Sequence, residues 1–154
     1  MTRPLAKDLD RGMLPSLLGY ALRRAQSAVF ADFAATFATA GEAVTPGEFG
    51  LLELVSCNSG LSQMALARAL GIDRSTLVPI LDRLQARGLL LRRASRTDGR
   101  THALALTAAG TRALAAFKRL VRRHEKRIAQ GLSAAETRTL IGLLGRVHRN
   151  ARRV

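Results

Sequence analysis

The chain has 154 residues, of which 47% are apolar, so it suits one domain with its own core and is not a disordered tail. It holds 25 basic and 11 acidic residues, and a net charge of +14 favours a polyanionic partner such as nucleic acid. A single cysteine excludes an internal disulfide framework and a CxxC metal site, so we expect a cytoplasmic protein without a cofactor. Because no apolar run approaches about 20 residues, and the N-terminus is unlike a signal peptide, we expect no membrane association.

The charge is unevenly distributed along the chain. Residues 1–60 hold five basic and six acidic residues, whereas residues 61–154 hold the other 20 basic and five acidic ones. A coding bias towards arginine at solvated positions accounts for part of this charge, but not for the contrast between the two segments. A basic half beside a neutral half therefore indicates a surface for an anionic partner.

The first two predicted elements are helices. Apolar residues recur at helical spacing from about Leu14 to Thr39 and predict a long first helix. Thr45 then predicts an N-cap, because Pro46 occupies the first helical position and Glu48 completes a capping box. We expect this second helix to reach about Val55.

Two further helices follow with a tight turn between them. Ser62 predicts the N-cap of a short third helix that ends at Leu70, and Asp73 predicts the cap of a fourth helix that runs to Arg87. Pro79 lies inside the fourth helix and predicts either a bend or a tolerated loss of one hydrogen bond. The apolar stripe expected to be buried on the fourth helix is Leu77, Ile80, Leu81 and Leu84.

A β-hairpin and two long helices complete the predicted fold. Extended runs at about 89–91 and 102–106 flank an Asp-Gly pair, which is the sequence signal for a hairpin. Thr107 starts a helix to about Gln130, and a capping box at Ser133 opens a last helix to about Arg152.

The predicted fold class is mainly α, a winged helix–turn–helix with a small β-hairpin and long flanking helices. We expect residues 1–154 to form a single domain. In it, residues 14–44 and 108–152 form a dimerisation region and residues 45–107 the DNA-binding region. The apolar residues expected to be buried between two copies are Leu14, Leu17, Leu18, Leu140, Leu143, Leu144 and Val147.

In a helix–turn–helix, the start of the second helix meets base edges in the major groove. Arg74, Ser75 and Thr76 occupy that start, and arginine can donate two hydrogen bonds to guanine. An ordinary helical hairpin is the alternative, but the arginine-rich hairpin that follows favours DNA, because a wing can place arginine in the minor groove. The candidate DNA-binding residues are Ser62, Gln63, Asp73, Arg74, Ser75, Thr76, Val78, Pro79, Asp82, Arg83, Arg96, Asp98 and Arg100.

Three stretches of this sequence resemble the MarR family of bacterial winged-helix regulators. They are residues 62–78 (SQMALARALGIDRSTLV), residues 81–89 with LDRL and RGL, and residues 98–110 with DGR and LTAAG. The resemblance implies a homodimer whose first, fifth and sixth helices interlock. It also implies a wing in which Arg100 meets DNA and Asp98 orients it.

The segment 19–30 resembles the MarR subgroup that regulates hydroxycinnamate catabolism, whose members respond to aromatic acyl-CoA thioesters. This resemblance implies a repressor that such an effector releases from a pseudo-palindromic operator, and an unrelated small aromatic effector is the alternative. Arginine beside aromatic side chains suits both a phosphate and an aromatic group. The candidate ligand-binding residues are Tyr20, Arg23, Arg24, Ser27, Phe30 and Phe49.

The sequence gives only weak signals for catalysis, metal binding or redox chemistry. We find no nucleophile–base pair, glycine-rich phosphate loop or paired carboxylates, so we expect no enzyme, and the three histidines predict no metal site. Cys57 is either a small, partly buried side chain or a redox sensor. The basic run 119–127 is either a solvated face or a contact for DNA or ligand. The alternative functions are a sequence-nonspecific DNA-architectural protein, a cysteine-based redox regulator and a helical module that binds an acidic protein.

Overall fold

The computed structural model describes residues 9–58, 60–94 and 102–152. Its described part is mainly helical, with one two-stranded antiparallel sheet, as the sequence predicts. The elements in chain order are a 3₁₀ turn η1 (Leu14–Ser16), α1 (Leu18–Ala38), α2 (Pro46–Cys57), α3 (Gln63–Leu70), α4 (Arg74–Ala86), β1 (Leu90–Ala94), β2 (His102–Leu106), α5 (Ala108–Ile128) and α6 (Ala134–Ala151).

The helices begin where the capping residues predict. Thr45 and Ser133 each complete a capping box, in which the side chain accepts from the third helical residue and that residue's glutamate accepts in return. Ser62 and Asp73 cap α3 and α4 through single side-chain bonds. Gly71 ends α3 with a φ of +66°, a left-handed conformation that glycine adopts without strain.

The first helix is shorter than expected. Leu14 to Ser16 form only a 3₁₀ turn, and α1 begins at Leu18 because Leu17 has an extended backbone with a ψ of 123°. At the other end, α1 stops at Ala38. In contrast, α2 continues two residues past the predicted end, to Cys57.

The two strands pair in one register, from Leu90 opposite Leu106 to Ala94 opposite His102. The backbone also ties this sheet to the start of α3, because the Leu104 N–H donates to the Leu61 carbonyl at 3.0 Å. An isolated bridge joins Ser62 to Ala103 beside it. The helix–turn–helix and the base of the hairpin therefore form one unit.

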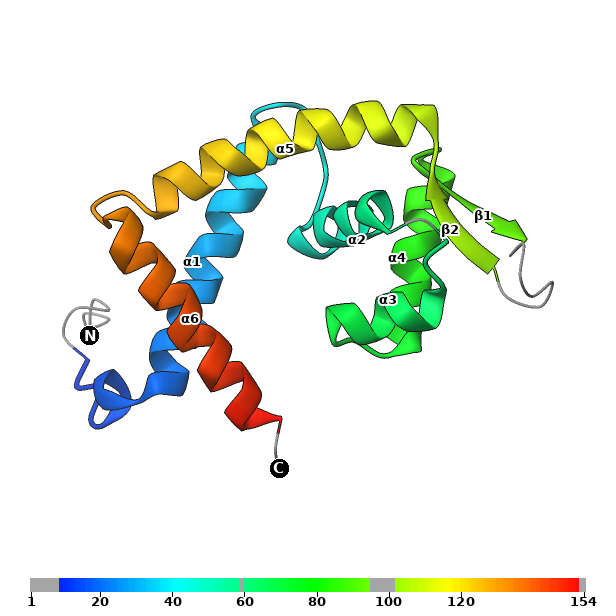
Figure 1. Cartoon of the computed structure of the whole chain (residues 1–154). Helices are drawn as coiled ribbons and strands as arrows, with labels where there is room; N and C mark the ends of the chain where they lie inside the picture. The colour runs from blue at the N-terminus through cyan, green and yellow to red at the C-terminus, as the bar shows by residue number, and fades with distance from the viewer. Residues whose placement is uncertain (1–8, 59, 95–101, 153–154) are drawn as a thin grey trace, which may run out of the picture.

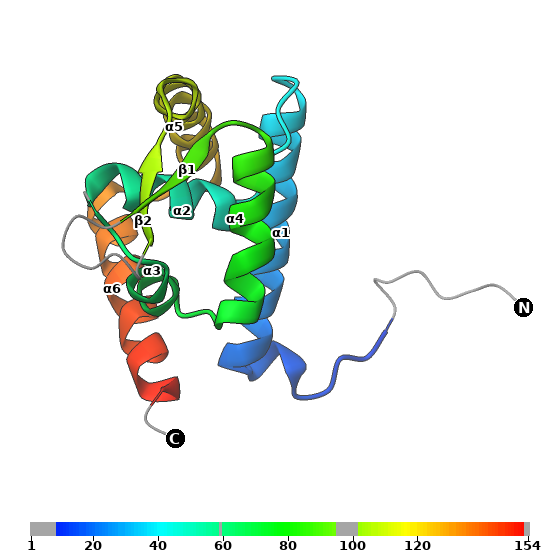
Figure 2. The ribbon, with the colours of Figure 1, turned by 90° about the vertical axis from the view of Figure 1, so that its right-hand side faces the viewer.

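The long helix α5 runs across the top of the molecule in Figure 1 and is seen nearly end-on near the top in Figure 2. Below one end of α5 lie α2, α3, α4 and the hairpin, and below the other end lie α1 and α6. Within the winged part, α3 and the first turn of α4 lie on the side away from α5. This arrangement separates a winged helix–turn–helix from a pair of long helices, with α5 joining the two.

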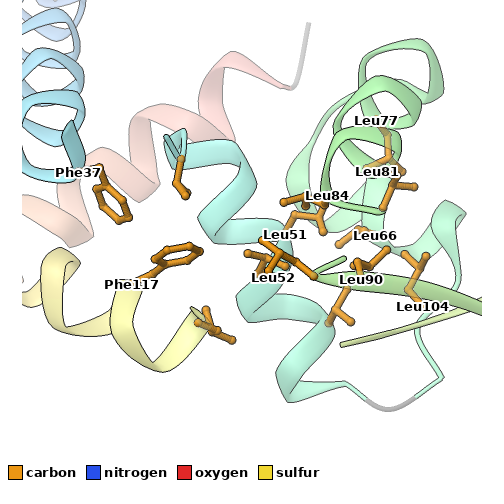
Figure 3. Close-up of a cluster of buried hydrophobic side chains, with 14 of the residues drawn as sticks. Phe37, Leu51, Leu52, Leu66, Leu77, Leu81, Leu84, Leu90, Leu104 and Phe117 are labelled. Atoms are coloured by element: carbon orange, nitrogen blue, oxygen red, sulfur yellow. The ribbon is translucent and has the colours of Figure 1, made fainter. Parts of the chain in front are cut away.

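One hydrophobic core holds the winged part together and extends to α1 (Figure 3). Three of the four predicted α4 residues are fully buried, and Ile80 is only half-buried. On α3 the buried residue is Leu66, whereas the side chain of Met64 is 64% exposed. The fully buried leucines are Leu51, Leu52, Leu66, Leu77, Leu81, Leu84 and Leu104.

Stacked aromatic rings link α1 to α5. Phe33 and Phe37 stack with centroids 4.5 Å apart, and Phe37 lies 5.6 Å from Phe117. All three rings are buried, so Phe33 and Phe37 belong to the packed core.

The helix α6 buries none of its residues in a single chain. Its leucines and those at the start of α1 form an uncovered apolar face, with Leu18 59% exposed and Leu143 48% exposed. Soluble proteins rarely leave a contiguous apolar face of this kind in contact with water, so we expect another protein surface to bury it. The exposed residues among those expected at a dimer interface are Leu14, Leu17, Leu18, Leu140, Leu143 and Leu144, with Val147 half-buried.

Candidate nucleic-acid interface and effector site

The start of α4 is shaped by Asp73. One oxygen of its carboxylate accepts hydrogen bonds from the Ser75 hydroxyl at 2.6 Å and from the Thr76 backbone N–H at 2.8 Å. These bonds, led by that from Ser75, hold the pKa of Asp73 below its ordinary value. The carboxylate therefore serves as a cap, and Arg74 remains as an exposed cation beside the positive end of the helix.

The starts of α3 and α4 surround one hollow of about 760 Å³. The helix α3 contributes Ser62, which caps it by accepting from the Ala65 N–H, and the neighbouring Gln63. Arg74 lines the same hollow, as does Arg152 at the C-terminal end of α6. The structure thus brings the candidate residues at the starts of both helices to one face.

The helix α4 continues without a break through Pro79. Pro79 is exposed, and so is Ser75, whose carbonyl loses its helical donor. Water can reach that carbonyl, so the second of the two expected outcomes, a tolerated loss, describes this helix. Val78, beside it, is half-buried.

Two candidate DNA contacts on α4 have partners within the chain. Asp82 pairs with Arg92 of β1 at 2.7 Å, and Arg83 donates to Glu48 of α2 at 3.1 Å. Glu48 is buried and also closes the α2 capping box, so its carboxylate is shared between two roles. In the free protein these two side chains hold α4 against its neighbours.

The wing residues Arg96, Asp98 and Arg100 lie outside the described residues.

The candidate effector residues of α1 form a small cluster around one ring. The guanidinium carbons of Arg23 and Arg24 each lie 5.7 Å from the centre of the Tyr20 ring. Both arginines are exposed in the single chain. Ser27 and Phe30 are exposed on the same helix.

The cluster does not extend to Phe49. That residue packs half-buried against the hydrophobic core from α2. Neither the hollow at α3 and α4 nor a second one, also about 760 Å³, is lined by any candidate effector residue. The second hollow lies between the end of α1 and α4, where Arg87 donates to the Ala43 carbonyl at 2.8 Å.

A polar network that sequence reasoning missed joins α1 to α5. Arg127 donates to both carboxylate oxygens of Asp32 at 2.7 Å, and His124 Nδ1 lies 2.6 Å from one of them. Arg127 also donates to the Thr36 hydroxyl. Hydrogen bonds, first from Arg127 and then from His124, lower the pKa of Asp32 to about 2. Since Asp32 and His124 are 92 residues apart, no local pattern could reveal the pair.

Cys57 is exposed, so the expectation of a partly buried side chain is wrong. Its sulfur lies 3.8 Å from a carboxylate oxygen of Glu53. Reactive cysteines sit in electropositive surroundings, whereas this neighbour is an anion. Among the described residues, no group of histidine, cysteine, aspartate or glutamate side chains could hold a metal ion.

In the part of the chain with described structure, no helix combines the length and apolarity that crossing a membrane requires.

Comparisons with known proteins agree with this geometry. The sequence pattern of the MarR family matches residues 44–101. A Thauera aromatica protein assigned as a transcriptional regulatory protein for the hcr operon is 44% identical over 142 residues, 92% of this chain and 85% of that protein.

Two solved structures of the transcriptional repressor CouR are similar over 92% of this chain and 99% of theirs. The structure bound to a 23-mer DNA duplex is 41% identical with a TM-score of 0.85. The structure bound to p-coumaroyl-CoA is 40% identical with a TM-score of 0.83. Because this similarity spans nearly the whole chain and includes the winged helix–turn–helix, the chain belongs to the MarR family and is a transcriptional regulator.

Proposed function

We propose that this regulator is a ligand-responsive repressor that binds a pseudo-palindromic operator and leaves it when a small aromatic effector, an aromatic acyl-CoA thioester, binds. The observation that carries the proposal is the similarity, over 92% of the chain, to one repressor solved both with DNA and with p-coumaroyl-CoA. Like its relatives, the proposed repressor acts by binding DNA and not by catalysis. Because the bacterial genome lies in the cytoplasm, the proposed location is cytoplasmic.

The functional unit of the proposal is a homodimer. The exposed leucines of α6 and of the start of α1 supply the apolar surface that a second copy would cover. The dimerisation region then consists of residues 14–44 and 108–152. The DNA-binding region of each copy, which we call its DNA-binding lobe, consists of residues 45–107. Two lobes related by a two-fold axis match half-sites about 10 base pairs apart.

In this proposal, Arg74 reads base edges, while Arg96 and Arg100 of the wing contact the DNA backbone or minor groove and Asp98 orients Arg100. Ser62, Gln63, Ser75, Thr76, Val78 and Pro79 line the approach to the groove. Asp73 caps α4, and Asp82 and Arg83 hold α4 in place. The described geometry supports this division, because Asp82 and Arg83 form ion pairs within the chain and Asp73 caps α4, whereas Arg74 is exposed and pairs with no described carboxylate.

Arg74→Ala and Arg100→Ala should affect DNA binding differently. We expect Arg74→Ala to change base preference by about 1–3 kcal/mol at one position of each half-site. Arg100→Ala should weaken binding to all sequences and reduce the salt slope by about 1 per site. Fluorescence anisotropy on promoter duplexes at several salt concentrations measures both effects.

Footprinting tests the same proposal independently. Protection of one short dyad supports an operator-specific repressor, whereas uniform coating of the duplex would indicate an architectural protein. If Arg100→Ala changed neither affinity nor its salt dependence, the wing would have no role in binding.

For the effector, two guanidinium groups share one aromatic ring and form no ion pair with a described carboxylate. An anion near them relieves their mutual repulsion, and phosphate accepts bidentate bonds from arginine. The phosphates of coenzyme A fit this chemistry, and the exposed apolar surface of Phe30 suits an aromatic acyl group.

A DNA-release titration separates the thioester from the free acid. We expect p-coumaroyl-CoA to release the operator at concentrations at least about tenfold lower than p-coumaric acid, because the acid lacks the phosphates. Arg23→Ala and Arg24→Ala should reduce that advantage, and Arg138→Ala on α6 is the matched control. Equal potency of acid and thioester would reject the acyl-CoA proposal and leave the repressor proposal standing.

A further inference from the structure

The helix α5 has two chemically different faces. The face turned to the core buries Leu114, Phe117 and His124. At about 100° per residue, the opposite face is an arc that spans about 100° around the helix and about 20 Å along it. The residues of this outer arc that carry charge are all basic and exposed: Arg112, Arg119, Arg122, Arg123 and Lys126.

Several cations elsewhere in the described chain are paired with a carboxylate, but the five of the outer arc are not. Arg83, Arg92, Lys118 and Arg127 each meet a carboxylate, at 2.7 to 3.1 Å. No described carboxylate forms an ion pair with any of the five cations of the outer arc. The Arg119 side chain donates one hydrogen bond to the Ala115 carbonyl within the same helix, which leaves its charge without a described counterion. The arc therefore carries five positive charges that repel one another and are not neutralised within the described chain.

The composition of the arc favours a phosphate backbone over a protein partner. Between the cations lie only Ala115 and Ala116, so the surface offers no large apolar anchor. Protein interfaces depend on buried aromatic or aliphatic anchors and are depleted of charge at their centre. Binding to DNA phosphates needs no such anchor, because released counterions supply the free energy.

The position of the arc separates it from the candidate operator-binding face. The core face of α5 packs on α1 and α2, so the outer arc points away from them. The helix α3 and the start of α4 lie on the side of the winged part that is away from α5 (Figures 1 and 2). One straight duplex cannot contact both surfaces of the same chain.

We propose that the outer arc of α5 binds the phosphate backbone of a second DNA duplex while the winged helix–turn–helix holds the first. This function goes beyond operator binding, since it lets one dimer bridge two DNA segments. The interaction is independent of sequence and sensitive to salt.

A bridging assay tests the proposal. Full-length protein is bound to an immobilised promoter duplex, and capture of a second, fluorescent duplex is measured at several salt concentrations. We expect the triple variant Arg112→Gln, Arg119→Gln and Arg123→Gln to reduce capture about tenfold or more and to lower its salt slope by about 2 to 3. Binding of the first duplex, followed by anisotropy, should be unchanged.

Two further variants make the result specific. The control Arg138→Gln, Arg146→Gln and Arg149→Gln removes the same charge from exposed positions of α6. At about 100° per residue these positions face away from the exposed leucines of α6, so the control should keep both dimerisation and bridging. Lysine at the three α5 positions should restore it, because phosphate accepts a point charge. Equal loss in the α6 control, or no loss in the α5 variant, would overturn the proposal. Poly-glutamate binding to the α5 arc without duplex capture would instead identify an acidic protein partner.

These outcomes are distinguishable from failure of the proposed function. Loss of binding to the first duplex tests the repressor, whereas loss of capture of the second tests only the outer arc of α5.

Discussion

We expect Gly110→Ala to lower the free energy of unfolding by about 3 kcal/mol, at the upper end of the usual cost of overpacking. A β-carbon at this position would lie 1.9 Å from the carbonyl oxygen and 2.8 Å from the carbonyl carbon of Leu89. Both are backbone atoms, so no side-chain rotation can relieve the clash. The start of α5 would have to move away from the strand.

The hydrogen bonds around Gly110 make that movement costly. The Thr107 N–H donates to the Leu89 carbonyl at 3.1 Å, and the Thr107 hydroxyl donates to the Gly88 carbonyl at 2.7 Å. The Gly110 N–H in turn donates to the Thr107 hydroxyl at 2.8 Å. The glycine of the LTAAG segment therefore permits a close approach that fixes α5 to the winged helix–turn–helix.

Thermal and urea denaturation measure the effect. A cost of about 3 kcal/mol should lower Tm by roughly 6–12 °C in a chain of this size. The matched control is Gly142→Ala in α6, where an added β-carbon meets no atom within 4 Å. Since alanine is the better helix former, Gly142→Ala should be neutral or stabilising by up to about 1 kcal/mol. Similar losses in both variants would contradict the close contact.

The order and type of the elements could be predicted because their signals are local. A cap at Thr45, Ser62, Asp73 or Ser133 depends on residues within one turn, and each of these caps forms as expected. The hairpin follows from two short runs around an Asp-Gly pair. The boundary at Leu17 could not be predicted, because the apolar spacing continues through a residue with an extended backbone.

The candidate site could be predicted only in part. Exposure of Arg74 follows from its place at the first position of α4, outside the apolar stripe. The partners of Asp82 and Arg83 belong to other elements, β1 and α2, so helical position alone groups these two residues with the DNA contacts. Burial of Phe33 and Phe37 likewise depends on Phe117, which only the tertiary fold brings near them.

The Asp32 network predicts a specific loss of stability in acid. Its carboxyl has a pKa of about 2 in the folded chain against an ordinary value of 3.8. A lowered folded-state pKa means that the carboxylate contributes its full stabilisation above about pH 4 and loses it as the pH falls through about 2. Between these two pH values, the Asp32 carboxyl is largely protonated in the unfolded chain but still ionised in the folded protein, so unfolding takes up a proton.

We therefore expect Asp32→Asn to lower Tm at neutral pH, because Arg127 and the buried His124 lose their anionic partner. The difference in Tm between wild type and Asp32→Asn should stay constant from neutral pH to about pH 4 and shrink between pH 4 and 2. Calorimetric scans across that range measure it.

Asp82→Asn is the matched control, since it removes a carboxylate that pairs with Arg92 but is 59% exposed. An exposed pair contributes little to stability, so this variant should have nearly the wild-type Tm at neutral pH. A difference between wild type and Asp32→Asn that remained unchanged down to pH 2 would mean that Asp32 stabilises the contact between α1 and α5 by packing and not by its charge.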